Sequence, residues 1–345
     1  MRVLIIGGTR FTGPFTVQNL MAMGHDIALF HRGRSETDLP PGVMHLHGDR
    51  QNLPAHAEAI RHFAPHLVLD MCAMTEADAQ AILVVVSGLA SRLVVASSAD
   101  VYRAYGVLIR KESGPVQPVP LSEDAELRQQ LYPYRANPLR AADDPRAWMD
   151  QYDKILVERA VMNHPDIAGT VLRLPMMYGP GDGQHRWYQD IKRMEDGRPA
   201  ILVGESRAGW RTCLGYVENC ALAFTLAVTE DRAAGRIYNV ADTESPPLAT
   251  WTRMIGEAAG WTGRVAVVPD DQLPEHLASE GRAEQDLTLD THRIRQELGF
   301  AERVPLEQAL RRTVAWEREH PPEGTAPTAE QYAAEDAVLT IAGGP

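Results

Sequence analysis

Cysteine is scarce in this sequence. The chain has 345 residues and three cysteines, Cys72, Cys213 and Cys220, whose spacing matches neither a set of disulfide pairs nor a metal-binding motif. An odd, small number of thiols is typical of proteins in reducing compartments, where disulfides do not persist. We therefore expect free thiols, no bound metal and a cytoplasmic location.

Long apolar runs and an excess of positive charge are also missing. The longest apolar stretch, 81–96, is too short and too polar to span a bilayer, because it contains Ser87, Gly88, Ser91 and Arg92. The N-terminal apolar run has only four residues, Val3 to Ile6, before glycines follow, which predicts a strand rather than a signal peptide. The net charge of −12 argues against a nucleic acid or an anionic membrane, since both attract clustered Lys and Arg. The expected partner is a small molecule.

The sequence does contain a glycine turn between an apolar strand and a helix. Val3 to Ile6 form a short β-branched run, and the helix continues to about Met23 before a second apolar strand at 27–30. Glycines let the backbone turn sharply and approach a phosphate, which then faces the free N–H groups of the helix. This order predicts a dinucleotide site, with cofactor contacts from Gly7, Gly8, Thr9, Arg10, Phe11 and Gly13.

Position 10 departs from the usual spacing of such turns, which places glycines at 7, 10 and 13. Arg10 stands there instead, and we expect it to contact a cofactor phosphate, although a solvated side chain is the alternative.

The end of the second strand bears on the choice between NAD and NADP. His31, Arg32 and Arg34 lie where a carboxylate would bind the adenosine ribose of NAD, and a cation there suits the 2′-phosphate of NADP. We expect NADP, with NAD as the alternative. Arg32 and Arg34 could instead belong to a solvated loop.

Strands and helices alternate through the first half of the chain. Further strands are predicted at 43–47, 66–71, 92–96, 170–174 and 235–241, so the fold class is α/β, with a Rossmann-type, doubly wound parallel sheet. We expect a dinucleotide-binding domain at 1–175, completed by about 216–241. Residues 176–215 and 242–320 would form a smaller substrate-binding domain, 103–147 a partly ordered lid, and 321–345 a loosely held tail.

In such a sheet the ligand lies over the carboxyl ends of the strands. Asp49 could bind the adenine amino group, small residues after the fourth strand would let the ribose pass, and Met176 would line the nicotinamide pocket. The further cofactor contacts expected at these strand ends are Asp49, Arg50, Met71, Cys72, Ala73, Pro175 and Met176.

The chain resembles the extended short-chain dehydrogenases/reductases, of the NAD-dependent epimerase/dehydratase group. The similarity rests on the glycine turn, Ser97-Ser98 before Val101-Tyr102, Lys154 with Glu158, the run 173–180, and Tyr216-Val217-Glu218. The Gly-Gly-Thr-Arg-Phe form of the turn is similar to an atypical branch that includes chloroplast RNA-binding proteins. Members of the family often pair through two helices, so the resemblance allows a homodimer.

The resemblance implies three catalytic roles. A Ser or Thr holds the substrate oxygen, a Tyr transfers a proton, and a Lys four residues after that Tyr binds the nicotinamide ribose and lowers the pKa of the Tyr. Ser98 matches the first role and Lys154, in a helix predicted over 148–163, matches the third. The residue four positions before Lys154 is Asp150, not Tyr.

Three explanations remain open for the proton donor. A late or irregular helix start could put Tyr152 in place of the usual Tyr. Alternatively, Tyr102, Tyr134, Tyr178 or a water could protonate the substrate, or catalysis could be lost and only cofactor binding kept. Asp100 is expected to be solvated or hydrogen-bonded rather than catalytic.

These features predict an NAD(P)H-dependent oxidoreductase that transfers a hydride to or from a ketone or carbinol of a small molecule. Its catalytic residues would be Ser98, Tyr152 and Lys154. The alternatives are a nucleotide-sugar epimerase or dehydratase with tightly bound NAD, and a non-catalytic nucleotide- or RNA-binding relative.

Overall fold

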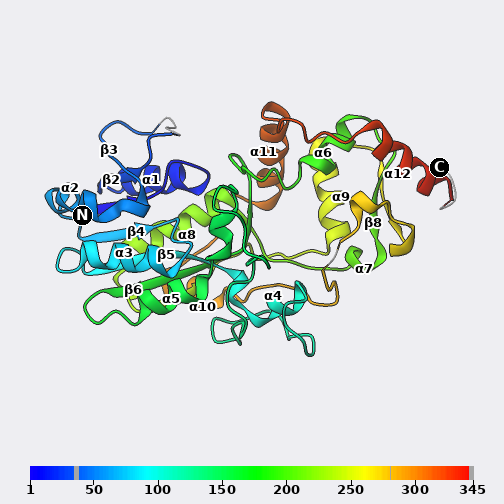
Figure 1. The fold of residues 1–345 in the computed structure, drawn as a ribbon. Helices are drawn as coiled ribbons and strands as arrows, with labels where there is room; N and C mark the ends of the chain where they lie inside the picture. The colour runs from blue at the N-terminus through cyan, green and yellow to red at the C-terminus, as the bar shows by residue number, and fades with distance from the viewer. Residues whose placement is uncertain (35–38, 280, 342–345) are drawn as a thin grey trace.

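The fold is built around a seven-stranded sheet in which every neighbouring pair of strands is parallel (Figure 1). The computed structural model describes residues 1–34, 39–279 and 281–341. The strand order is β10-β6-β5-β4-β1-β2-β3, so the chain reverses its direction of winding between β1 and β4. The bounds are β1 Arg2–Ile6, β2 Asp26–His31, β3 Met44–His47, β4 Leu67–Asp70, β5 Arg92–Ser98, β6 Ala168–Leu174 and β10 Arg236–Asn239.

Helices cover both faces of this sheet, because its central strands are apolar on both sides. Along β1, Val3 and Ile5 join the core under one set of helices, whereas Leu4 and Ile6 join the core under the other. The first set is α1 (Thr12–Ala22), α8 (Val217–Thr229) and α10 (His292–Leu298). The second is α2 (Ala57–Phe63), α3 (Glu76–Val86) and α5 (Lys154–Met162). The predicted Rossmann-type sheet is confirmed.

The remaining elements gather beside the carboxyl ends of the strands, on the right in Figure 1. A parallel pair, β7 (Met176–Tyr178) and β9 (Leu214–Tyr216), leads from the sheet into this region. A second parallel pair joins β8 (Ala200–Gly204) to β11 (Arg264–Val268). Trp251, Tyr178 and Tyr216 are fully buried in the aromatic core of this region. Its helices are α6 (Tyr188–Glu195), α7 (Glu205–Ala208), α9 (Leu248–Ala259), α11 (Leu306–Glu319) and α12 (Ala329–Ile341).

Short elements complete the chain. They are the α-helix α4 (Arg103–Leu108) and the 3-10 turns η1 (Arg50–His56), η2 (Ala99–Val101), η3 (Ala147–Asp150), η4 (Asp231–Ala233), η5 (Asp270–Gln272) and η6 (Glu275–Leu277). Across the described ranges, no helix has the length and apolar character that a bilayer span requires. The three cysteines are free thiols.

The structure differs from the expected domain limits at α10. This helix falls within 242–320, yet Ile294 and Leu298 are buried against the seven-stranded sheet. The sequence did not predict this contact, because α10 is far along the chain from the strands that it covers.

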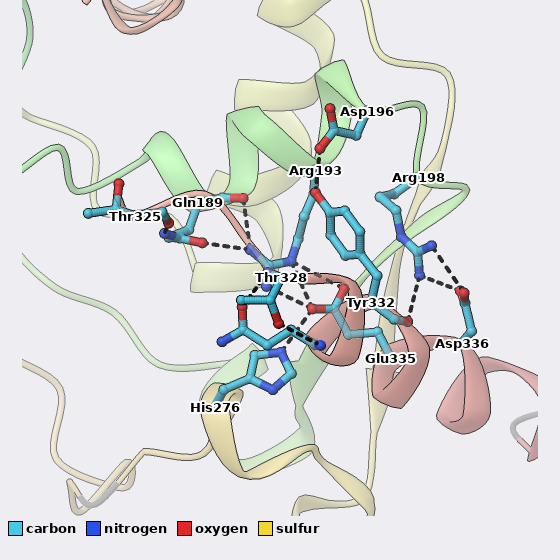
Figure 2. Close-up of polar contacts among 11 residues, drawn as sticks. Gln189, Arg193, Asp196, Arg198, His276, Thr325, Thr328, Tyr332, Glu335 and Asp336 are labelled. Atoms are coloured by element: carbon cyan, nitrogen blue, oxygen red, sulfur yellow. Dashed lines mark hydrogen bonds and ion pairs between the residues drawn. The ribbon is translucent and has the colours of Figure 1, made fainter. Parts of the chain in front are cut away.

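The expected loose tail is also not what residues 329–341 form. Glu335 of α12 is buried and forms an ion pair of 2.7 Å with buried Arg193 of α6, and His276 contacts the same carboxylate at 2.9 Å (Figure 2). The Tyr332 hydroxyl donates a hydrogen bond to Asp196 at 2.6 Å. These polar contacts hold α12 together with the apolar packing of Val338 against β8 and β11. Apolar periodicity does not reveal the polar contacts.

Candidate active site

The glycine turn between β1 and α1 has the geometry that a dinucleotide requires. Gly7 and Gly8 have positive φ angles of 89° and 84°, a region that side chains disfavour. A Cβ on Gly13 would lie 2.3 Å from the carbonyl of Gly8, so only glycine lets the first turn of α1 approach the strand this closely. Thr12 and Gly13 begin α1 directly above the turn, with no side-chain cap on the first N–H groups. The residues present therefore fit a pyrophosphate at this helix end.

The other expected cofactor residues lie at the carboxyl ends of neighbouring strands. Arg10 of the turn is exposed. His31 ends β2 and Arg32 follows it on the surface, whereas Met71, Cys72 and Ala73 follow β4, and Pro175 and Met176 follow β6. Asp49 accepts a hydrogen bond of 3.0 Å from the Gln51 N–H at the start of η1.

Arg50 is held by acidic residues of the protein. It makes a bidentate pair with buried Asp70 at 2.9 Å and a second pair with Asp78 at 2.9 Å. Cys72 lies beside this pair, and burial raises the pKa of its thiol to about 11. These contacts fix the strand end at β4.

Lys154 is buried where β4 and β5 end. Its ammonium donates to the carbonyls of Ala73 at 2.6 Å and Ala96 at 2.9 Å, which fixes the position of the charge. Burial lowers the pKa of Lys154, and the negative charge of Asp100 partly offsets this effect.

The helix that carries Lys154 begins later than predicted. Asp153 is the N-cap of α5 and accepts a hydrogen bond of 2.9 Å from the Ile155 N–H, so residues 148–153 lie outside the helix. Asp150 accepts from the backbone N–H groups of Ala136 at 2.9 Å and Arg140 at 2.7 Å. The carboxylate at the usual Tyr position is thus used to hold the 103–147 segment.

The Tyr152 side chain instead extends to Asp100, just after the carboxyl end of β5. Its hydroxyl donates a hydrogen bond of 2.7 Å to the Asp100 carboxylate, and the Lys154 nitrogen lies 5.9 Å from its ring centre. The Ser98 hydroxyl accepts a hydrogen bond of 3.2 Å from the Asp100 N–H. Ser98 also lies close enough to Tyr152 to lower the pKa of its hydroxyl through a side-chain hydrogen bond. The three residues predicted as catalytic, Ser98, Tyr152 and Lys154, are therefore brought together around Asp100.

Asp100 lies at the centre of this cluster. It is buried rather than solvated, and burial raises its pKa, although the hydrogen bond from Tyr152 and the charges of Arg128 and Lys154 oppose this effect. Burial and the Asp100 charge together raise the pKa of Tyr152 well above its usual value. The Asp100 Oδ1 atom is buried and has no hydrogen-bond partner among the described residues.

Two more tyrosines extend the cluster. The Tyr134 hydroxyl donates to Asp100 at 3.1 Å and lies 2.8 Å from the Tyr105 hydroxyl. Tyr134 is one of the alternatives expected from the sequence, but Tyr105 carries no motif that could identify it. Both residues come from 103–147, so this segment contributes directly to the site.

The other tyrosines considered as donors lie in separate clusters. The buried Tyr102 hydroxyl donates to Asn239 at 2.5 Å and accepts from Arg173 at 3.0 Å. The Tyr178 hydroxyl donates to Asp242 at 3.2 Å, beneath Trp251. Within the described parts of the chain, these hydroxyls bond to neither Asp100 nor Lys154.

Comparisons with known proteins agree with the fold. The family model described as "NAD dependent epimerase/dehydratase family" matches residues 3–241. A 2′-dehydrokanamycin reductase of Streptomyces kanamyceticus is 26% identical over 80% of this chain and 72% of its own length. A 3-diazoavenalumate denitrifying reductase of a Streptomyces species is 27% identical, over 81% and 86%. The solved complex of a Thermus thermophilus UDP-glucose 4-epimerase with NAD has a TM-score of 0.64 and 21% identity, covering 93% of this chain and all of that one.

Proposed function

Because the chain belongs to the NAD-dependent epimerase/dehydratase family, we propose that it reduces a ketone of a small molecule and that Tyr152 supplies the proton. The chain is an NAD(P)-dependent enzyme of the oxidoreductase type, and its cofactor is a nicotinamide dinucleotide. The proposal adds the direction of the reaction, the proton donor and the choice of NADP.

The observation that carries the proposal is the contact between Tyr152 and Asp100. The Tyr152 hydroxyl lies 2.7 Å from the buried Asp100 carboxylate, with Ser98 and the buried Lys154 beside it, and this placement supports Tyr152 as the proton donor. The pKa of Tyr152 is not below its ordinary value, so the hydroxyl carries a proton at neutral pH. The direction of reduction is supported by the two relatives that are named as reductases.

The cofactor would be held by the glycine turn, by the strand ends after β4 and β6, and by Lys154. When bound, the nicotinamide supplies the hydride that reaches the carbonyl carbon. Ser98 would orient the carbonyl oxygen, and Tyr152 Oη would pass its proton to that oxygen. A proton from solvent would then restore Tyr152, whose hydroxyl Asp100 would hold in place through their hydrogen bond. The Lys154 ammonium would stabilise the negative charge that develops on the oxygen.

The choice of NADP is supported by the end of β2. Arg32 is exposed directly after His31, at the position where a cation suits the 2′-phosphate. Removing one charge-assisted contact of this type costs roughly 1.5–3 kcal/mol, or a factor of at least about 10 in affinity. We expect Arg32→Ala to raise the dissociation constant for NADPH by that factor and to leave NADH unchanged. Arg61→Ala, which removes an exposed arginine of α2, is the control.

The function is tested by identifying the bound nucleotide and then assaying turnover. Denatured samples of the purified protein are analysed by mass spectrometry for nicotinamide dinucleotides, and calorimetry measures the binding of NADPH, NADH, NADP and NAD. Oxidation of added NADPH is then followed with ketones, including the 2′-dehydrokanamycin named for one relative. Stoichiometric loss of NADPH and of carbonyl supports the proposal. Tightly held NAD with epimer interconversion and no net reduction would contradict it, and so would the absence of binding by any dinucleotide.

A further inference from the structure

Three histidines meet at the edge of the seven-stranded sheet. His31 ends β2, and His45 and His47 lie in β3, two residues apart and therefore on one face of that strand. The strand register pairs His31 with His47 and Leu29 with His45. His31 is buried, whereas His45 and His47 are exposed, so the cluster is open to solvent on one side.

The ring nitrogens are close enough to share one ion. One nitrogen from each histidine can be chosen so that all three lie within 4.8 Å of one another. His31 Nε2 lies 2.8 Å from His45 Nδ1, and the His31 ring centre is 4.8 Å from that of His47. Tetrahedral zinc with bonds of about 2.0 Å needs nitrogens separated by about 3.3 Å. Small side-chain rotations would reach this arrangement.

We propose that His31, His45 and His47 bind one divalent transition-metal ion of the zinc type. Imidazole nitrogen suits zinc, copper and nickel, whereas magnesium and calcium prefer oxygen ligands. Three protein ligands leave the fourth position of a tetrahedral ion for water or another ligand. The ion would also join the edge strand β3 to β2.

Metal binding replaces a proton in this cluster. The 2.8 Å contact between His31 and His45 is a hydrogen bond, in which one ring donates a proton to the other. An ion at His31 Nε2 places the proton of that ring on Nδ1, which then no longer accepts the 3.2 Å hydrogen bond from the Gly33 N–H. Gly33 is exposed, so its N–H can bond to water instead. The Nδ1–H of His31 then needs an acceptor such as water in place of the Gly33 N–H.

The sequence alone predicted no metal site, because its cysteines lack a metal-ligand spacing. The pattern that could have pointed to the histidine site is His-Leu-His at 45–47, within the strand predicted at 43–47. Strand order and register were needed to bring the three rings together.

The test is calorimetry on full-length protein without an affinity tag, after treatment with a chelator. Zinc chloride is titrated into the wild type, His45→Ala, His47→Gln and the double variant His45→Ala/His47→Gln. His62→Ala is the matched control, because it removes an exposed histidine of α2 outside the cluster. Magnesium chloride serves as the hard-cation control, and thermal melting without metal checks that each variant folds.

We expect one zinc per wild-type chain and the same affinity in His62→Ala. Each single substitution should weaken zinc binding at least about 10-fold, because even residues that only orient metal ligands cost 10- to 100-fold. The double variant should release no heat of specific zinc binding, and magnesium should not bind. Absence of zinc binding by the wild type would overturn the proposal, and so would unchanged affinity in the folded double variant or equal weakening in His62→Ala.

Discussion

The Tyr152 hydroxyl and the Asp100 carboxylate form a hydrogen bond of 2.7 Å between two segments that are far apart in the sequence. Asp100 lies in the turn after β5, and Tyr152 lies just before α5. Lys154 lies near the carboxyl ends of β4 and β5, where its ammonium donates hydrogen bonds to the carbonyls of Ala73 and Ala96. In the proposed site, a spacing of two would replace the usual four-residue spacing between tyrosine and lysine, because the helix begins at Lys154.

Substitution of Gly13 tests the glycine turn. In Gly13→Ala the new Cβ would lie 2.3 Å from the Gly8 carbonyl, so α1 must move away from the strand. We expect a stability loss of roughly 1–3 kcal/mol, typical of overpacking, and at least about 10-fold weaker dinucleotide binding. Urea unfolding and calorimetry measure the two effects.

The matched control is Gly209→Ala. A Cβ at Gly209 meets no heavy atom within 4 Å, and its φ of −86° suits any residue. This variant should bind dinucleotide as the wild type does. Unchanged binding in Gly13→Ala would show that the turn does not hold the cofactor.

Most of the dinucleotide-binding sheet could be predicted from local pattern. Short β-branched runs such as Val3 to Ile6 are followed by glycines or small residues, and this punctuation repeats along the chain. Packing between distant segments left no such signal. The position of α10 on the sheet and the contact of α12 with α6 became visible only in three dimensions.

Motif position predicted most of the candidate site residues, and the proton donor depended on where one helix starts. Asp153 before Lys154 and Ile155 is a residue type that commonly caps helices, so the late start of α5 had a local signal. The burial of Asp100 had none, because it is caused by Tyr134 and Tyr152, which come from other parts of the chain.

The ion pair between Arg193 and Glu335 should contribute strongly to stability. Glu335→Gln leaves the Arg193 charge buried without its counterion, and removing one partner of a buried pair costs about 3–5 kcal/mol. Asp336→Asn is the control, because the Asp336 side chain is 57% exposed and pairs with Arg198 at the surface. This change should cost less than about 1 kcal/mol. Equal losses for the two variants in urea unfolding would contradict the assigned role of Glu335.

The raised pKa of Asp190 should make the stability of the protein depend on pH. Burial raises its pKa from 3.8 to about 6, so the folded state binds more protons than the unfolded state between these values. Its contribution to stability therefore falls as the pH rises from about 4 to 6, and the ionised carboxyl costs the fold roughly 3 kcal/mol above that range.

Asp190→Asn removes this charge while keeping a hydrogen-bond acceptor for Thr252, 3.5 Å away in the wild type. We expect the variant to be more stable than the wild type at pH 7.5, by up to that amount, and to lose the advantage at pH 4. Urea unfolding at both values measures the difference. An equal difference at the two pH values would show that the Asp190 charge is not the cause.

The proton-transfer role of Tyr152 is tested most directly by the turnover number of Tyr152→Phe with saturating NADPH and a ketone substrate. We predict a fall of at least about 100-fold in kcat, the range for loss of a general acid, with the dissociation constant for NADPH unchanged. Tyr134→Phe removes the neighbouring hydroxyl on Asp100 and should lower kcat far less. A Tyr152→Phe enzyme that keeps kcat within a few-fold of the wild type would contradict the account.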